Sequence, residues 1–246
     1  MRSLKLSFAL AVATLLLSQT VLARPIVFAR STTVMAEFRE GAMGEAQVFY
    51  APTYNWSFGL GHLELDSGDM DVRHSVTYAR ANLLAKRWNR ENSQANVFLW
   101  GGVGQARVGG YWVLPVAPGA PPSEHDHGGQ PAAEPYYWPG AQEIAWNSGG
   151  QIDFETRRFY SSLKSDYYWS RAFIHRTDTL QLGVALNNHD VNTLATWLIV
   201  SGRNYYGNMH EGQELALLLR FFKKRVWLEA GVNLDGGAQA MAMFTF

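Results

Sequence analysis

The sequence predicts an all-β chain that closes into a single antiparallel transmembrane β-barrel, and three observations lead to this fold class. The first is a long series of short, aromatic-rich segments in which apolar and polar residues alternate, as barrel strands require. The second is that no apolar stretch reaches the roughly 20 residues of a spanning helix. The third is the C-terminal end, where Phe244 and Phe246 occupy alternate positions. Twelve strands fit the pattern best, and eight to ten remain open.

The segment 1–23 has the pattern of a secretory signal peptide. Arg2 and Lys5 form a short positive region, and the apolar run Leu6–Leu17 is too short to cross a bilayer of roughly 30 Å as a helix. Residues 21–23 suit cleavage by signal peptidase. We therefore expect the barrel to comprise residues 24–246 of an exported chain; an uncleaved N-terminal anchor is the alternative.

The composition excludes several classes of function. The chain has no cysteine, which excludes disulfides, thiol catalysis, cysteine-ligated metals and a lipoprotein anchor. It has 21 basic and 21 acidic residues with no basic stripe, so a nucleic-acid partner is not expected. Many of the nine Trp and eleven Tyr fall near the ends of predicted strands, as in the interfacial girdles of membrane barrels. A soluble β-sandwich rich in aromatic residues is the alternative fold.

The clearest strands lie at the C-terminal end. Leu215, Leu217 and Leu219 fall on one face of a strand, and Glu214 and Arg220 fall on the other. Turns of sequence Lys-Lys-Arg and Asp-Gly-Gly separate this strand from two more alternating segments, so the three form a meander. The twelve predicted strands cover residues 32–39, 45–51, 54–65, 72–87, 94–113, 136–146, 150–165, 171–186, 193–205, 212–222, 226–234 and 237–246.

Two details of this strand pattern carry further expectations. The apolar parity changes between Leu60 and Leu63, which predicts a β-bulge near Gly61-His62. An even number of strands puts both chain ends in the periplasm and the longest loop outside. The same count predicts short periplasmic turns at Pro52-Thr53, at Asn147–Gly149 and at 223–225.

The loop at about 115–135 is rich in Pro and Gly, and proline cannot donate a ladder hydrogen bond within a central strand. It contains Glu124-His125-Asp126-His127. Imidazole and carboxylate ligands suit a divalent transition metal such as Zn²⁺, Cu²⁺ or Ni²⁺, so His125 and His127 could bind one. A solvated hydrophilic loop is the alternative, and no other cofactor is expected.

Charged side chains are expected to face the lumen, because Arg or Lys facing lipid near the midplane costs about 2–4 kcal/mol. On the predicted strand 150–165, Arg158 and Lys164 fall on the outward parity. These charges could line a selective pore or fill the interior with salt bridges. The candidate pore-lining residues are Asp153, Glu155, Arg157, Glu214, Arg220 and Glu229.

An enzyme is not expected. Acyl hydrolysis needs a serine within reach of an activating histidine. His74 and Ser75 are adjacent in a predicted strand, so their side chains point to opposite faces and cannot pair directly.

The end of the chain resembles a known class. Phe244 and Phe246 are similar to the C-terminal signal by which the barrel-assembly machinery recognises outer-membrane β-barrel proteins of Gram-negative bacteria. The segments 151–158 and 195–197 resemble stretches of uncharacterised proteobacterial outer-membrane proteins. The resemblance implies insertion by that machinery into the bacterial outer membrane, among lipid and lipopolysaccharide.

The function expected from these patterns is a narrow channel for small solutes or ions, because charged residues face inward and a long outer loop could constrict the mouth. The alternative is a non-conducting barrel that binds a metal ion or a partner through its outer loops. An outer-membrane lipid hydrolase is the third reading, and the solute itself is not predicted.

Overall fold

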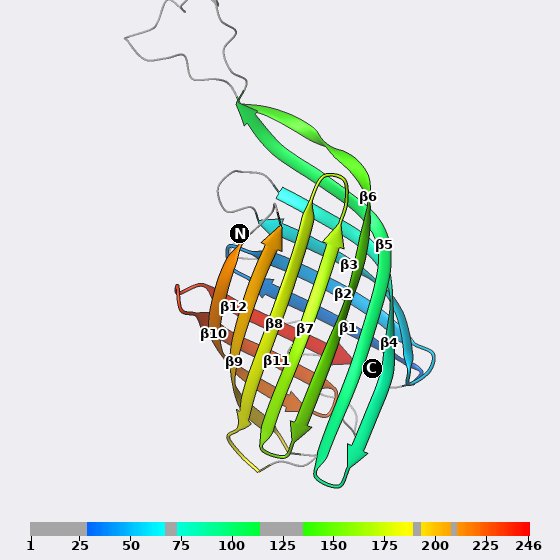
Figure 1. The fold of residues 1–246 in the computed structure, drawn as a ribbon, viewed down its shortest axis with the longest axis vertical. Coiled ribbons are helices and arrows are strands. Elements are labelled where there is room, and N and C mark those ends of the chain that lie inside the picture. The colour runs from blue at the N-terminus through cyan, green and yellow to red at the C-terminus, as the bar shows by residue number, and fades with distance from the viewer. Residues whose placement is uncertain (1–28, 67–72, 114–134, 189–192, 208–210) are drawn as a thin grey trace, which may run out of the picture.

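The structure is a computed structural model that describes residues 29–66, 73–113, 135–188, 193–207 and 211–246, and these form a closed barrel of twelve antiparallel strands (Figure 1). Each strand pairs with its neighbours in sequence. The all-β fold and the twelve strands are thus confirmed. The strands are β1 (Ser31–Arg39), β2 (Met43–Ala51), β3 (Trp56–Asp66), β4 (Arg73–Arg90), β5 (Ser93–Val113), β6 (Pro135–Thr156), β7 (Phe159–Trp169), β8 (Ile174–Ala185), β9 (Ala195–Gly207), β10 (Gly212–Lys223), β11 (Val226–Asn233) and β12 (Ala238–Thr245).

The barrel closes where the first strand meets the last. The backbones of Thr32 and Phe246 exchange two hydrogen bonds, of 2.8 and 2.9 Å, and the ladder continues to the pair Arg39 and Gln239. Within the closed part of the barrel the sheet has no open edge, so its backbone groups there are paired without water. Beyond that part, residues 135–145 of β6 pair with β5 alone. No helix long and apolar enough to cross a membrane occurs among the residues that the structure describes.

The strand order defines two ends of the barrel. The terminus end carries the start of β1, the end of β12 and the turns that follow β2, β4, β6, β8 and β10. The loop end carries the other six connections. On the loop end β5 and β6 continue past the neighbouring strands toward the connection at 114–134 (Figure 1). That connection, which contains His125 and His127, and the segment 1–28 lie outside the described residues.

The outer face of the barrel is an apolar belt formed by alternate residues of most strands. Single apolar side chains on a protein surface are ordinary, but a continuous apolar band around a closed barrel is the surface that suits lipid. The belt includes Val34, Val48, Phe58, Leu60, Val103, Ile144, Ile152, Leu163, Leu180, Leu182, Val200, Leu215, Leu217, Leu219 and Val232, all of them exposed.

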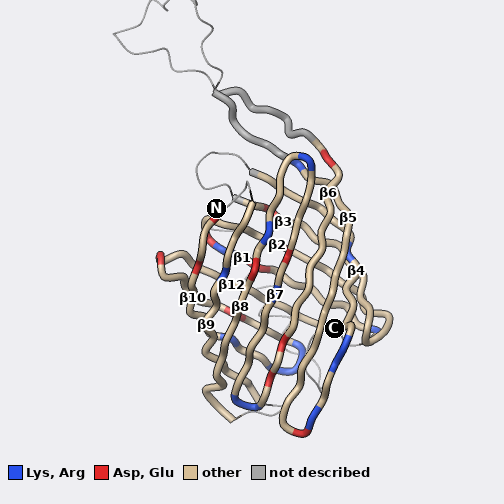
Figure 2. Tube along the Cα trace, in the orientation of Figure 1, with Lys and Arg blue, Asp and Glu red and all other residues tan. Residues whose placement is uncertain are grey.

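Polar side chains border this belt on both ends. Toward the loop end the outward positions change to polar residues such as His62, Glu64 and Gln142. Toward the terminus end two of the turns are basic (Figure 2), Arg157-Arg158 after β6 and Lys224-Arg225 after β10. The apolar belt therefore forms a band around the barrel, with polar residues on both sides of it.

The predicted turn at Asn147–Gly149 is wrong, because β6 runs unbroken from Pro135 to Thr156. A side chain at Gly149 would come within 2.6 Å of the ring of Trp100, so glycine is needed there to make room. The turn occurs instead at Arg157-Arg158. There the Thr156 hydroxyl accepts hydrogen bonds from the backbone N–H groups of Arg158, at 3.1 Å, and Phe159, at 2.8 Å.

The predicted bulge at Gly61-His62 is also wrong. β3 keeps one register with β2 and with β4 along its length, and the ladders are shifted instead between Leu84 and Lys86 and between Val108 and Gly110. Leu63 faces the lumen like Gly61 before it. The change of apolar parity marks an apolar cluster inside the barrel, not an irregular strand.

This inner apolar cluster fills the β3–β7 side of the lumen toward the loop end. Its members are almost fully buried, and the cluster closes that side by side-chain packing as in any protein core. The cluster consists of Leu63, Leu65, Val76, Tyr78, Ala106, Ala145, Tyr168 and Phe173.

Candidate functional site

A cavity of about 290 Å³ occupies the lumen on the terminus side of the barrel. All twelve strands contribute to its wall, which mixes apolar side chains such as Phe98 with polar ones such as Asn96 and Gln151. Small-molecule sites in proteins begin at about 300 Å³, so this space suits a small ligand. The lumen is thus not filled along its whole length.

The wall of the cavity carries a group that we call the arginine clamp. It consists of Arg220 with Glu229, Gln181, Tyr160 and Trp227. The Arg220 Nε donates to Glu229 Oε1 at 2.8 Å, and its Nη2 donates to Gln181 at 2.8 Å. The guanidinium lies 4.2 Å from the ring centre of Tyr160 and 4.4 Å from that of Trp227. Its charge is thus held by an ion pair and two aromatic faces.

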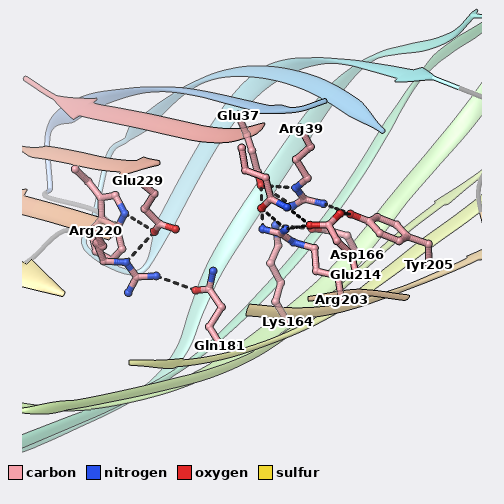
Figure 3. Close-up of polar contacts among 12 residues, drawn as sticks. Glu37, Arg39, Lys164, Asp166, Gln181, Arg203, Tyr205, Glu214, Arg220 and Glu229 are labelled. Carbon is pink, nitrogen blue, oxygen red and sulfur yellow. Dashed lines mark hydrogen bonds and ion pairs between the residues drawn. The ribbon is translucent and has the colours of Figure 1, made fainter. Parts of the chain in front are cut away.

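A second group of charges, the central charged layer, lies apart from the arginine clamp, as Figure 3 shows. Its ion pairs join Glu37 Oε1 to Arg39 Nη2 at 2.5 Å, Asp166 to Lys164 Nζ at 2.6 Å, and Glu214 to Arg203 Nη1 at 2.9 Å. The central charged layer comprises Glu37, Arg39, Lys164, Asp166, Arg203 and Glu214.

The central charged layer separates two spaces. Glu37, Arg39 and Lys164 border the large cavity and also a pocket of about 20 Å³ on the loop side. Since the same side chains touch both spaces, they lie between them. On the loop side of this layer the inner apolar cluster and the small pocket adjoin it, so packed side chains narrow the lumen there.

The β9–β12 and β1 side of the layer is polar. Arg39 Nη1 donates to the hydroxyl of Tyr205 at 3.2 Å, and that hydroxyl donates to Glu214 Oε2 at 2.9 Å. Gln239 is hydrogen-bonded to both Arg203 and Glu214. These contacts join strands far apart in sequence across the lumen.

The opposite side of the lumen is bordered by the inner apolar cluster, whose two tyrosines are hydrogen-bonded to Glu45. The Tyr78 hydroxyl donates to Glu45 Oε1 at 2.5 Å, and the Tyr168 hydroxyl donates to the same oxygen at 2.9 Å. Toward its loop end the lumen is therefore apolar on the β3–β7 side and polar on the side of β9, β10, β12 and β1.

The structure places most of the predicted pore-lining residues in the lumen. Asp153 and Glu155 from β6, with Arg220 and Glu229, border the cavity, and Glu214 belongs to the central charged layer. Asp153 accepts a hydrogen bond from Asn96 Nδ2 at 2.6 Å.

Two predictions about orientation are corrected by the structure. Arg157 lies exposed in the turn after β6 and does not line the lumen. Lys164 was expected outside, but it faces the lumen because the turn at Arg157-Arg158 resets the parity of β7. The error follows from the misplaced turn.

The sequence pattern did not single out Glu37, Arg39 or Arg203, although a signal for them was present. Glu37 and Arg39 stand on the parity opposite to Val34 and Phe38, and Arg203 stands opposite to Val200. A charged residue on the parity opposite to the apolar belt points inward. Parity gives orientation, but it does not say which inward charges meet.

Among the described residues, no group of three or more His, Cys, Asp or Glu is placed to hold a metal ion. His74 on β4 is buried toward the lumen beside Phe173, with ring centres 5.8 Å apart. The rings of Phe244 and Phe246 lie stacked at the terminus end, 5.7 Å apart, and Phe246 is exposed there.

No protein-family model matches this chain, and neither does any curated protein sequence. Among solved structures the chain is similar to OmpTdeltaL8, a loop L8 deletion mutant of OmpT, an outer membrane protein of Vibrio cholerae. The identity is 9%, the TM-score is 0.32, and the match covers 88% of this chain and 97% of that chain. The assignment of the fold rests on the closed strand pairing itself.

Proposed function

We propose that this chain is a bacterial outer-membrane β-barrel that acts as a narrow channel for small solutes, held closed by the central charged layer. The observation that carries the proposal is the cavity of about 290 Å³ whose wall continues into that layer. A barrel that served only as an anchor has no need of an open space of this kind inside its wall.

The outer surface supports the proposed location in the outer membrane. The apolar belt needs lipid around it, and closed barrels are one of the two structures that satisfy all backbone groups within a bilayer. The polar outward positions at the loop end and the two basic turns at the terminus end suit the two headgroup regions. In this arrangement the terminus end faces the periplasm and the loop end faces the exterior, among lipopolysaccharide.

In this proposal the solute passes along the polar side of the lumen, which is formed by β9, β10, β12 and β1. Arg39, Arg203, Tyr205 and Glu214 are joined by hydrogen bonds of side chains, which can exchange with water or solute without moving the strands. Side-chain rotamer changes are fast compared with backbone rearrangement. Charged side chains that line a pore govern ion selectivity in channels.

Single-channel recording on purified, refolded protein in a planar bilayer tests the proposal. The expected result is brief openings of low conductance, because the layer must part for each passage. A silent bilayer at high protein density would argue against a channel.

A second candidate is a non-conducting barrel that holds a ligand in the cavity. The inner apolar cluster favours it, because Leu63, Tyr168 and their neighbours close part of the loop end with packed, almost fully buried side chains.

Binding of a divalent metal by His125 and His127 remains a prediction. Calorimetric titration of the protein and of a His125→Ala/His127→Ala variant with Zn²⁺ would test it, and equal heats would remove that loop from consideration.

Catalysis is not part of this proposal. Incubation of the refolded protein with labelled outer-membrane phospholipid, in the presence and absence of Ca²⁺, is expected to release no fatty acid. Measurable release would replace the channel with a hydrolase.

A further inference from the structure

The four methionines that the structure describes all face the lumen. Met35 on β1 and Met241 and Met243 on β12 border the large cavity, and Met43 on β2 borders the small pocket. The apolar belt is built from Leu, Val, Ile, Phe, Trp and Tyr, and no described position of it is a methionine. The described methionines therefore lie on the inner face of the barrel and not on its outer face, and hydrophobicity alone does not explain this distribution.

Met35 and Met243 lie directly opposite each other across the seam that closes the barrel. Thr32 and Phe246 exchange hydrogen bonds, so the next inward pairs, Thr33 with Thr245 and Met35 with Met243, are of the non-hydrogen-bonded kind. In such pairs the Cα atoms are about 4.5 Å apart and the side chains approach closely. The hydroxyls of Thr33 and Thr245 are in fact 2.9 Å apart.

Met241 adds a third thioether to this pair. It lies two residues before Met243 on the same strand, and alternate residues of a strand point to the same face about 7 Å apart. Three thioethers from β1 and β12 thus face one region of the cavity.

These methionines are not filling a packed core. Met35, Met241 and Met243 are half-buried although they point inward, and none of them belongs to the buried apolar clusters of the barrel. Their remaining exposure is toward the cavity that they border. The usual role of methionine as a flexible filler of gaps therefore does not account for them.

The charges around Met241 favour a particular kind of ion. Glu37 on β1 and Glu229 on β11 stand opposite Met241 on its two sides. Both carboxylates are already paired, Glu37 with Arg39 at 2.5 Å and Glu229 with Arg220 at 2.8 Å. A hard cation would have to compete with these arginines for oxygen ligands, whereas a soft cation can bind neutral thioether sulfur.

We infer that Met35, Met241 and Met243 form a luminal binding site for a soft monovalent metal ion of the Cu(I) and Ag(I) class. As a binding site it stands independently of conduction. As the solute class of the channel it rests on the function proposed above.

Calorimetric titration with Ag(I) in chloride-free buffer tests the site, because Ag(I) requires no reductant. The full, refolded chain is compared with a Met35→Leu/Met241→Leu/Met243→Leu variant, in which leucine keeps a similar volume. Met43→Leu is the matched control, since Met43 faces the small pocket beyond the central charged layer. Histidines that bind Ag(I) are the same in all three proteins, so the difference isolates the thioethers.

The triple variant is expected to lose one bound Ag(I) or to bind it on the order of tenfold more weakly, since even outer-shell partners of a metal typically contribute that much. Met43→Leu is expected to bind like the unchanged protein. Equal titrations of the triple variant and the unchanged protein would overturn the site.

A second measurement separates this inference from the channel. Vesicles that contain the protein and an Ag(I)-sensitive dye report entry of the ion. Loss of binding in the triple variant without entry in any protein would keep the site and remove the channel. Potassium conductance with equal Ag(I) binding in all variants would keep the channel and remove the site.

Discussion

Arg220 on β10 and Glu229 on β11 form an ion pair of 2.8 Å inside the barrel, with both side chains almost fully buried. They are direct cross-strand neighbours, and the Nε1 of Trp227 donates to the same carboxylate oxygen at 2.7 Å. Each residue therefore supplies the opposite charge that compensates the other, because the remaining contacts of the pair are with uncharged side chains. This arrangement makes the pair sensitive to the loss of one member and tolerant to the loss of both.

Glu229→Leu should destabilise the barrel by about 3–5 kcal/mol, because it leaves the buried Arg220 charge without its partner. The double variant Arg220→Leu/Glu229→Leu should recover most of that loss. Urea unfolding in lipid vesicles measures both. A single variant no less stable than the double variant would contradict this account of the arginine clamp.

Gly61→Ala should destabilise the barrel by about 1–3 kcal/mol, the usual cost of overpacking. An added Cβ would lie 2.3 Å from Cζ of Tyr78, which must then move and weaken its hydrogen bond to Glu45. Gly44→Ala is the control, since nothing lies within 4 Å of its added Cβ. The unfolding free energy of each variant checks this, and equal losses at the two glycines would refute the packing argument.

Leu217→Arg should cost about 2–4 kcal/mol of folding free energy in vesicles, because Leu217 is exposed on the outer face near the middle of β10. Gln213→Arg near the loop end of the same strand should cost about 0–1 kcal/mol, as expected close to the interface. Equal costs for the two variants would mean that the apolar belt is not in lipid.

The C-terminal meander could be predicted from the sequence closely. The expected ranges 212–222 and 226–234 compare with Gly212–Lys223 and Val226–Asn233 in the structure. Their alternation is regular, and their turns contain residues that favour a left-handed backbone or are strongly polar. Lys224 has φ of 56° and Gly236 has φ of 89°.

The local sequence pattern predicts the strands wrongly where a residue is determined by a contact with a residue distant in sequence. Asn147, Ser148 and Gly149 have the composition of a turn, but Gly149 is required by the ring of Trp100 on β5. Leu63 and Leu65 break the apolar parity because they pack against residues from four other strands. The residues adjacent in sequence do not indicate either of these two contacts.

The candidate site could be predicted only in part, for the same physical reason. Parity indicates that Arg220 and Glu229 point inward, and their adjacency in a hairpin brings them together. The contact between Arg39 and Tyr205 depends instead on closure of the barrel and on its stagger. The position of the cavity depends on how all inward side chains fill the lumen, which no single segment contains.

Charge pairs in the lumen offer a matched comparison for conduction. The pair Glu37 and Arg39 lies between the large cavity and the small pocket, and Arg39 spans the polar half of the lumen to Tyr205. The pair Arg220 and Glu229 has the same composition but lies on the wall of the cavity alone. Removing both members of either pair avoids an unpaired buried charge.

The measurement that tests the central claim most directly is single-channel conductance of a Glu37→Ser/Arg39→Ser variant beside an Arg220→Ser/Glu229→Ser variant and the unchanged protein. If the central charged layer closes a channel, the first variant should show larger or longer openings than the other two proteins. Silent bilayers for all three proteins, each shown to be folded and inserted, would contradict the channel and leave a non-conducting barrel with a ligand cavity.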